Sequence, residues 1–140
     1  MAETVNHHHG TGSEGVTWDL SDLYSGLGDE RIEKDLSALL AKSRAYEKRH
    51  RGQINSRSVT AEALLKATKE LEALSELSGR LLSFAYLIFA ADTGNPEHGA
   101  FLQRIQEKAT EARKHLLFFE LELVAIPESK MKKLLADEKL

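Results

Sequence analysis

Residues 81–105 read LLSFAYLIFAADTGNPEHGAFLQRI and contain the clearest structural signal in the chain. An apolar run ends at Ala91, and residues 92–95 supply a short polar loop. Asn95 followed by Pro96 is typical of an N-cap residue and a proline at the first helical position. The stretch therefore predicts that one helix ends near Ala91 and that the next begins at Pro96. Because the connection is short, the two helices should pair antiparallel.

Helical spacing extends outward from this loop in both directions. Apolar and small residues recur at intervals of three and four along 64–88, and Glu62 would stand in the first turn of a helix that begins at Thr60. We therefore expect the first helix to run from Thr60 to about Ala91. The same spacing continues from Phe101 to Ile126, where Pro127 should end a single second helix. The centre of the fold is expected to be a hairpin of two helices of about 30 residues each.

Two shorter helices are expected on either side of this hairpin. Asp29 is a suitable N-cap for a helix that runs to about His50, with basic residues in its last turn and Gly52 after it. Another short helix is expected from about Glu128 to Ala136. The chain is therefore predicted to be all-α, a long antiparallel helical hairpin with a shorter N-terminal helix and a short C-terminal helix.

Residues 1–15 are expected to form a disordered leader, because they are polar and glycine-rich and show no apolar periodicity. Their three histidines, 7–9, are interpreted as an unstructured tract, since a metal site needs ligands fixed by a second shell. Residues 10–15, GTGSEG, match the dinucleotide fingerprint but lack the strand before it and the helix after it. Residues 16–140 are predicted to form one helical domain.

Composition excludes several classes of function. The net charge of −3 argues against a broad nucleic-acid surface, which needs a concentrated positive field. The chain has no cysteine, so it has no disulfide, thiolate zinc site or thiol nucleophile. The longest apolar run, 81–91, is about half the roughly 20 residues that span a bilayer. The leader has no apolar segment of a secretory signal. We therefore expect a cytoplasmic protein that binds neither nucleic acid nor membrane.

Apolar side chains also lie off the two seams, with one group at each end of the hairpin. The N-terminal helix is too short to reach the segment 81–91, although an arm around Trp18 and Tyr24 can cover one group. A helix that is apolar on all sides must be buried on several sides. We therefore expect a packing surface for a larger partner, and self-association of the isolated chain. The surface comprises Leu82, Phe84, Tyr86, Phe89, Leu117, Phe118 and Leu121.

No pattern in the sequence predicts a catalytic, cofactor-binding or metal-binding residue. Glu47 and His50 have the spacing of one half of a di-iron motif, but it occurs once and among cations, so we interpret it as a solvated helix end. Glu111 and His115, four positions apart, are interpreted as an ordinary surface pair. The zinc-protease motif His-Glu-x-x-His does not occur in the sequence.

Three segments, in this order, resemble the start of the oligoendopeptidase F family of zinc metallopeptidases, which are relatives of thimet oligopeptidase. The first is TWDLSDLY at 17–24. The second lies within 70–93 and includes LLSFAYL at 81–87 and AADT at 90–93. The third is LFFELEL at 117–123, followed closely by Ile126-Pro127. The resemblance covers residues 16–140.

The resemblance implies a parent hydrolase several times longer, which cleaves short peptides in a channel walled by helices. In that family, zinc is held by a His-Glu-x-x-His helix and a later Glu, and the Glu of the motif is the general base. These residues lie downstream of the matched region, so no catalytic role carries over and this chain should be inactive alone. The implied role is an N-terminal helical wall domain that packs on the catalytic domain. The alternative is a free-standing helical protein-interaction module.

Overall fold

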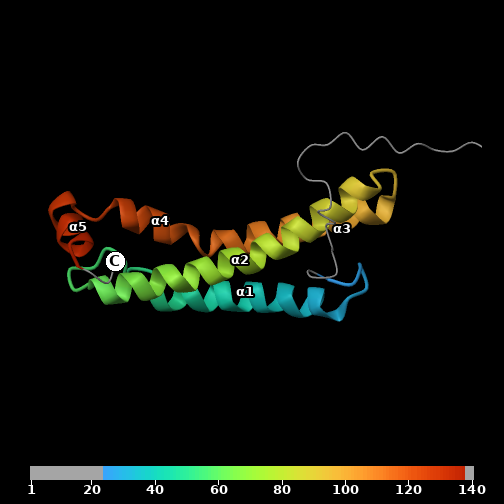
Figure 1. The fold of residues 1–140 in the computed structure, drawn as a ribbon. Coiled ribbons are helices and arrows are strands. Elements are labelled where there is room, and N and C mark those ends of the chain that lie inside the picture. Colours follow the sequence, from blue (N-terminus) through green and yellow to red (C-terminus); the bar gives the residue numbers. More distant parts are fainter. Residues whose placement is uncertain (1–23, 138–140) are drawn as a thin grey trace, which may run out of the picture.

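A computed structural model describes residues 24–137. Within this part of the chain there are five helices and no strand, which confirms the all-α prediction. They are α1 (Glu30–His50), α2 (Ala61–Ala91), α3 (Pro96–Lys114), α4 (Leu117–Val124) and α5 (Glu128–Leu135). The first three pack on one another along an elongated body, while α4 and α5 lie at the end where α1 connects to α2 (Figure 1). The leader 1–15 and Trp18 lie outside the described residues.

The three long helices begin close to the starts that the sequence predicted, and the predicted N-caps Asp29 and Asn95 are confirmed. The side chains of Asp29, Thr60 and Asn95 accept hydrogen bonds from the backbone N–H groups of residues 31, 63 and 97, which would otherwise lack a partner in the first turn. Pro96 occupies the first turn of α3, where its missing N–H costs nothing. After α1, Gly52 adopts φ of +82°, a left-handed conformation that favours glycine.

The predicted single helix from Pro96 to about Ile126 is wrong, because the structure breaks it into α3 and α4. Around the break the backbone makes tight i→i+3 hydrogen bonds: the Leu116 N–H donates to Arg113 O at 2.9 Å, and the Phe119 N–H to Leu116 O at 3.2 Å. No proline or glycine stands there, so the local sequence carries no break signal. The side chain of His115 instead contacts α1, and α4 turns away from α2 (Figure 1).

The core lies where α1, α2 and α3 meet, and it follows the predicted seams. Several of the buried residues of α2 and α3 are alanines, and small side chains let helix backbones pack closely. The Tyr46 hydroxyl, fully buried, donates to Ala67 O at 2.9 Å and so ties α1 to α2. The buried seam residues of these helices are Ile32, Leu36, Leu39, Leu64, Ala67, Leu74, Leu81, Ala85, Ile105, Ala109 and Ala112.

Tyr24 covers the end of the hairpin that α1 does not reach. Its ring packs edge-on against the ring of Phe84, with centroids 5.1 Å apart. The ring of Phe101 packs against the ring of Phe84 as well, at 6.0 Å between centroids. The Tyr24 hydroxyl donates to Asp35 Oδ2 at 2.7 Å. Burial, and then this carboxylate, raise the pKa of Tyr24 well above its usual value. The prediction that the arm before α1 covers this apolar end is thus confirmed for Tyr24.

At the opposite end, α4 and α5 fold over the connection between α1 and α2. The ring of Phe118 lies 5.7 Å from that of Tyr46, centroid to centroid. The Gly52 N–H donates to Glu122 Oε2 at 3.0 Å, and Lys130 Nζ donates to Ser56 O. These contacts hold the C-terminal part against residues that precede it by about 70 positions.

By length and apolar composition, α2 could cross a membrane, which the short apolar run 81–91 taken alone did not suggest. Core helices of soluble proteins share this length and apolar composition. In the structure α2 packs against both α1 and α3. That the chain does not enter a membrane stays a prediction.

Candidate functional site

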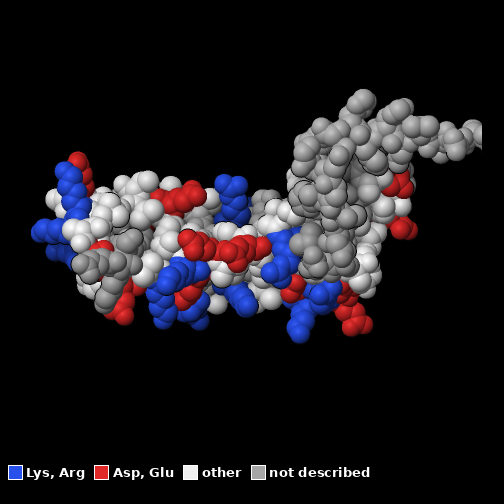
Figure 2. All heavy atoms as spheres, viewed as in Figure 1, with Lys and Arg blue, Asp and Glu red and all other residues white. Residues whose placement is uncertain are grey.

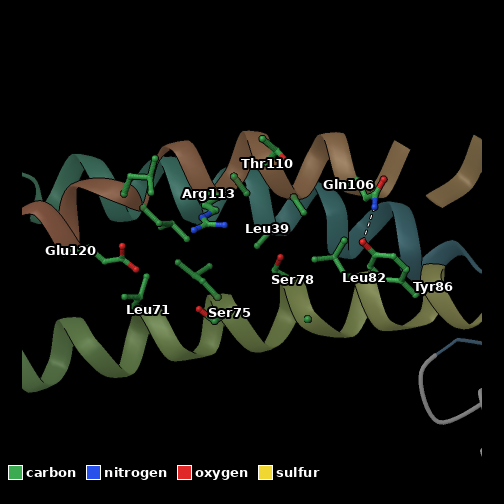
Figure 3. Close-up of a pocket in the computed structure, with 16 residues that line it drawn as sticks. Leu39, Leu71, Ser75, Ser78, Leu82, Tyr86, Gln106, Thr110, Arg113 and Glu120 are labelled. Carbon is green, nitrogen blue, oxygen red and sulfur yellow. Dashed lines mark hydrogen bonds between the residues drawn. The ribbon is translucent and has the colours of Figure 1, made fainter. Parts of the chain in front are cut away.

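A groove of about 640 Å³ lies between α2 on one side and α3 with α4 on the other (Figure 3). Leu39 of α1 contributes to its floor, together with Leu74 and Ala112. These three side chains are buried, so the floor is continuous with the core of the molecule. The groove is therefore a hollow above the buried core, and the exposed large apolar side chains of its lining are Tyr86 and Leu117.

Small side chains on α2 keep this groove open. Ser75, Ser78 and Gly79 all line it, and a Cβ atom at Gly79 would meet no other atom within 4 Å. On the opposite wall, the break after α3 turns α4 away from α2 (Figure 1). The groove thus results from small residues on one helix and a change of direction in the other.

Two charged side chains enter the groove from the α3–α4 wall. Arg113 stands in the last turn of α3 and Glu120 in the first turn of α4, and both point toward α2 in Figure 3. Neither side chain makes an ion pair or hydrogen bond with another residue of the described part. One end of the groove is closed, because Gln106 Nε2 donates to the Tyr86 hydroxyl at 2.7 Å across it (Figure 3). The groove therefore offers an apolar floor, one cation and one anion.

The seven residues of the predicted packing surface fall into three groups. Leu82, Tyr86 and Leu117 line the groove. Leu121 is 69% exposed, while Phe89 is half-buried beside Gly99 and does not line it. The inclusion of Phe84 and Phe118 in an uncovered surface is wrong, because they are 1% and 7% exposed. Phe84 is covered by Tyr24 and Phe101, and Phe118 packs against Tyr46.

Sequence reasoning missed the residues that give the groove its shape and charge. Ser75 and Gly79 lie one turn apart on α2, off the predicted seam, and a row of small side chains there was a usable signal. Arg113 and Glu120 carried no such signal. Their shared direction depends on the break between α3 and α4, which the sequence pattern does not show.

A second polar cluster joins α1 to the break after α3. His115 Nδ1 lies 2.6 Å from Glu47 Oε2, and Arg51 Nη1 lies 2.6 Å from Glu47 Oε1. The hydrogen bond with His115, and then that with Arg51, hold the pKa of Glu47 below its usual value in spite of partial burial. The cluster fixes the end of α3 against α1.

His50, although close in sequence to Glu47, belongs to a different contact. Its Nε2 lies 3.0 Å from Glu70 Oε2 on α2, and Arg49 Nη2 lies 3.0 Å from the same oxygen. Burial acts to raise the pKa of Glu70, but hydrogen bonding to His50 and the charge of Arg49 leave it lowered. Glu47 and His50 therefore serve different helix contacts, and their interpretation as a solvated helix end is wrong.

Glu111 and His115 are likewise not paired with each other. Glu111 binds Arg44 of α1 at 3.1 Å, whereas His115 binds Glu47. Acidic and basic side chains stand beside one another along the face drawn in Figure 2. Among residues 24–137, no three histidine, aspartate or glutamate side chains are grouped so as to hold a metal ion. Residues 7–9 lie outside that range.

Comparison of the chain with protein-family models, curated proteins and solved structures gives no match. The resemblance to the oligoendopeptidase F family rests on the sequence segments alone and stays a prediction. Two of them have defined positions in the fold. Residues 81–93 form the end of α2 and the start of its loop, and residues 117–123 lie in α4.

Proposed function

We propose that this chain is the N-terminal helical wall region of an oligopeptide-cleaving zinc metalloendopeptidase of the oligoendopeptidase F type. Its role is to supply packed helices against which a catalytic domain folds. Zinc and the general base would belong to that domain, and short peptides would be its substrates. The ordered resemblance of residues 17–24, 70–93 and 117–123 supports this assignment.

The observation that carries the proposal is the groove between α2 and α3–α4, whose lining exposes the apolar side chains of Tyr86 and Leu117. The residues beneath the groove are buried and apolar. The groove itself has a volume of about 640 Å³ and is open to solvent. Two segments that resemble the peptidase family, 81–93 and 117–123, each contribute to its walls through Leu82 and Leu117. An exposed apolar strip with polar residues at its rim is one feature of interaction surfaces.

The direct test is the coding sequence that follows the codon for Leu140. We expect an in-frame continuation that contains His-Glu-x-x-His and a later glutamate. The full-length product should cleave a quenched-fluorescent oligopeptide, lose activity with a chelator and regain it with zinc. The matched control is the same protein with the motif glutamate changed to glutamine. A stop codon directly after Leu140, or a continuation without the motif, would contradict the proposal.

One observation favours the alternative of a free-standing interaction module. Phe84 and Phe118, expected on the surface, are enclosed by the chain's own residues, so the module covers more of its core than its sequence indicated. Such a module would use the same groove to bind a partner protein. The coding sequence after Leu140 separates the two proposals.

A further inference from the structure

We infer that the groove between α2 and α3–α4 is the seat of an additional amphipathic helix, which carries an acidic residue opposite Arg113 and a basic residue opposite Glu120. The inference rests on the proposed function in one respect, that the chain docks onto further polypeptide. It names the surface, the secondary structure of the occupant and the charges that select it.

The dimensions of the groove suit a helix. Leu71 and Tyr86, which line it near its two ends, are 15 positions apart on α2. At 1.5 Å per residue this is a length of about 22 Å, or four helical turns. Ser75 and Gly79 lie one turn apart on the α2 wall and present almost no side chain. They permit the close approach, about 8–10 Å between axes, at which helices pack.

The walls of the groove select a helix over an extended peptide. The backbone N–H and C=O groups of α2 and α3 are engaged within their own helices. An extended peptide in the groove would find few partners for its own backbone groups, and buried unpaired groups are costly. A helix satisfies its backbone internally and needs to offer only an apolar face. The exposed apolar side chains of Tyr86 and Leu117 in the lining would contact such a face.

Charge selects the partner further. Arg113 and Glu120 are seven positions apart on either side of the break between α3 and α4, and both point into the groove (Figure 3). Neither has a partner among the described residues. If an apolar helix covered them, each would be left as an unpaired charge, which is strongly unfavourable. A helix with an acidic residue facing Arg113 and a basic residue facing Glu120 would pair with both.

The exposed face of α4 shows where the partner enters. Leu117, Leu121 and Val124 follow one another at intervals of four and three, and are 42%, 69% and 80% exposed. They form one apolar row that begins in the groove and continues beyond it. The other end is closed by the hydrogen bond between Gln106 and Tyr86. The occupant therefore extends past the α4 end of the groove.

The test uses the full chain and three labelled helical peptides of roughly 21 residues that share one leucine-alanine seam. One peptide carries Glu and Lys seven positions apart, the second carries two lysines there, and the third two glutamates. Fluorescence anisotropy measures binding. The unaltered chain should prefer the Glu/Lys peptide by about ten-fold. Arg113→Glu should shift the preference to the Lys/Lys peptide and Glu120→Lys to the Glu/Glu peptide. These preferences do not depend on the direction of the bound helix.

A second pair of variants tests the location of the site. Gly79→Leu places a side chain in the groove where nothing opposes it, so the chain should fold, which circular dichroism checks, and lose binding by about ten-fold or more. Ala73→Leu is the matched control, since Ala73 is exposed on α2 and does not line the groove. Equal binding by the two variants, or the same affinity for all three peptides, would overturn the inference.

Two further outcomes are decisive. The chain could form a dimer that Gly79→Leu dissociates and with which no peptide competes. The occupant of the groove would then be a second copy of the chain, and the inference of a separate partner helix would be wrong. Failure of the peptide experiment leaves the peptidase proposal to be judged by the coding sequence after Leu140. Conversely, charge-selective binding without a downstream His-Glu-x-x-His motif would support the groove as a helix-binding site and contradict the proposal that the chain belongs to a peptidase.

Discussion

The imidazole Nδ1 of His115 and the carboxylate Oε2 of Glu47 lie 2.6 Å apart, although the two residues are separated by 68 positions in the chain. The contact stands where α3 ends and α4 begins, and it fastens this break to the C-terminal part of α1. From there α4 turns away from α2 (Figure 1). A single polar contact is thus located at the change of direction that leaves the groove open.

The pair makes stability depend on pH. Because the pKa of Glu47 is lowered in the folded state, its carboxylate stabilises the fold above the ordinary value of 4.5 and loses this effect as pH falls through the lower, folded value. We expect Glu47→Gln to cost about 1 kcal/mol near pH 7 and almost nothing at the acid end. Urea unfolding between pH 7 and about pH 3 measures the difference. Glu76→Gln, at an exposed position on α2, is the control. A constant cost across this range would contradict the assignment.

Tyr24 should be a main contributor to the end of the bundle that α1 does not reach. Tyr24→Ala removes the ring that covers Phe84 and should cost about 3–5 kcal/mol, as deletion of a buried aromatic ring does. Tyr24→Phe keeps the ring and loses only the hydrogen bond to Asp35, so about 1 kcal/mol is expected. Chemical denaturation of both variants checks this. Equal losses would mean that the hydroxyl, and not the ring, matters.

The seam positions can be tested by large-to-small changes. Leu74 and Phe119 are each 6% exposed, so Leu74→Ala and Phe119→Ala should each cost about 2–5 kcal/mol. Leu121→Ala on the same short helix as Phe119 is the control, because that side chain is 69% exposed and should change stability by less than about 0.5 kcal/mol. If Leu121→Ala destabilises the chain as much as Phe119→Ala does, α4 packs on the core with a different face from the one that the structure shows.

Two glycines should respond in opposite directions to alanine. Gly79 lies inside α2 with open space where a Cβ would be, so Gly79→Ala should stabilise the chain by about 0.5–1 kcal/mol. Gly52 has a positive φ, so Gly52→Ala should destabilise it by about 1 kcal/mol. Thermal unfolding followed by circular dichroism measures both. Destabilisation by Gly79→Ala would show that the groove is filled in solution.

The exposed apolar row on α4 should bind a hydrophobic dye and promote self-association. Replacing Leu121 and Val124 together by serine should reduce both effects with little loss of stability, since the two side chains are largely exposed. Phe118→Ser is the contrasting variant, because this buried ring should cause unfolding instead. Dye fluorescence and light scattering at rising concentration are the measurements. A monomeric chain that binds no dye would show that the row is covered.

Local sequence determined where the three long helices begin and where the loop between α2 and α3 lies. N-capping side chains, Pro96 after Asn95, and Gly52 after α1 act within a few residues, so their effects can be recognised without knowledge of the rest of the fold. The apolar seams of α1 and α2 likewise depend only on the helical repeat. For the same reason the antiparallel hairpin could be predicted from the short loop at 92–95.

Tertiary structure alone decided the break between α3 and α4 and all that depends on it. The contact of His115 with Glu47 joins residues 68 positions apart, and no local pattern records it. The same holds for the enclosure of Phe84 by Tyr24 and of Phe118 by Tyr46, which moved two expected surface residues into the core. Periodicity shows which side chains share a face of one helix, but whether a face is covered depends on the directions of its neighbours. The groove that Arg113 and Glu120 enter is therefore a property of the packed helices.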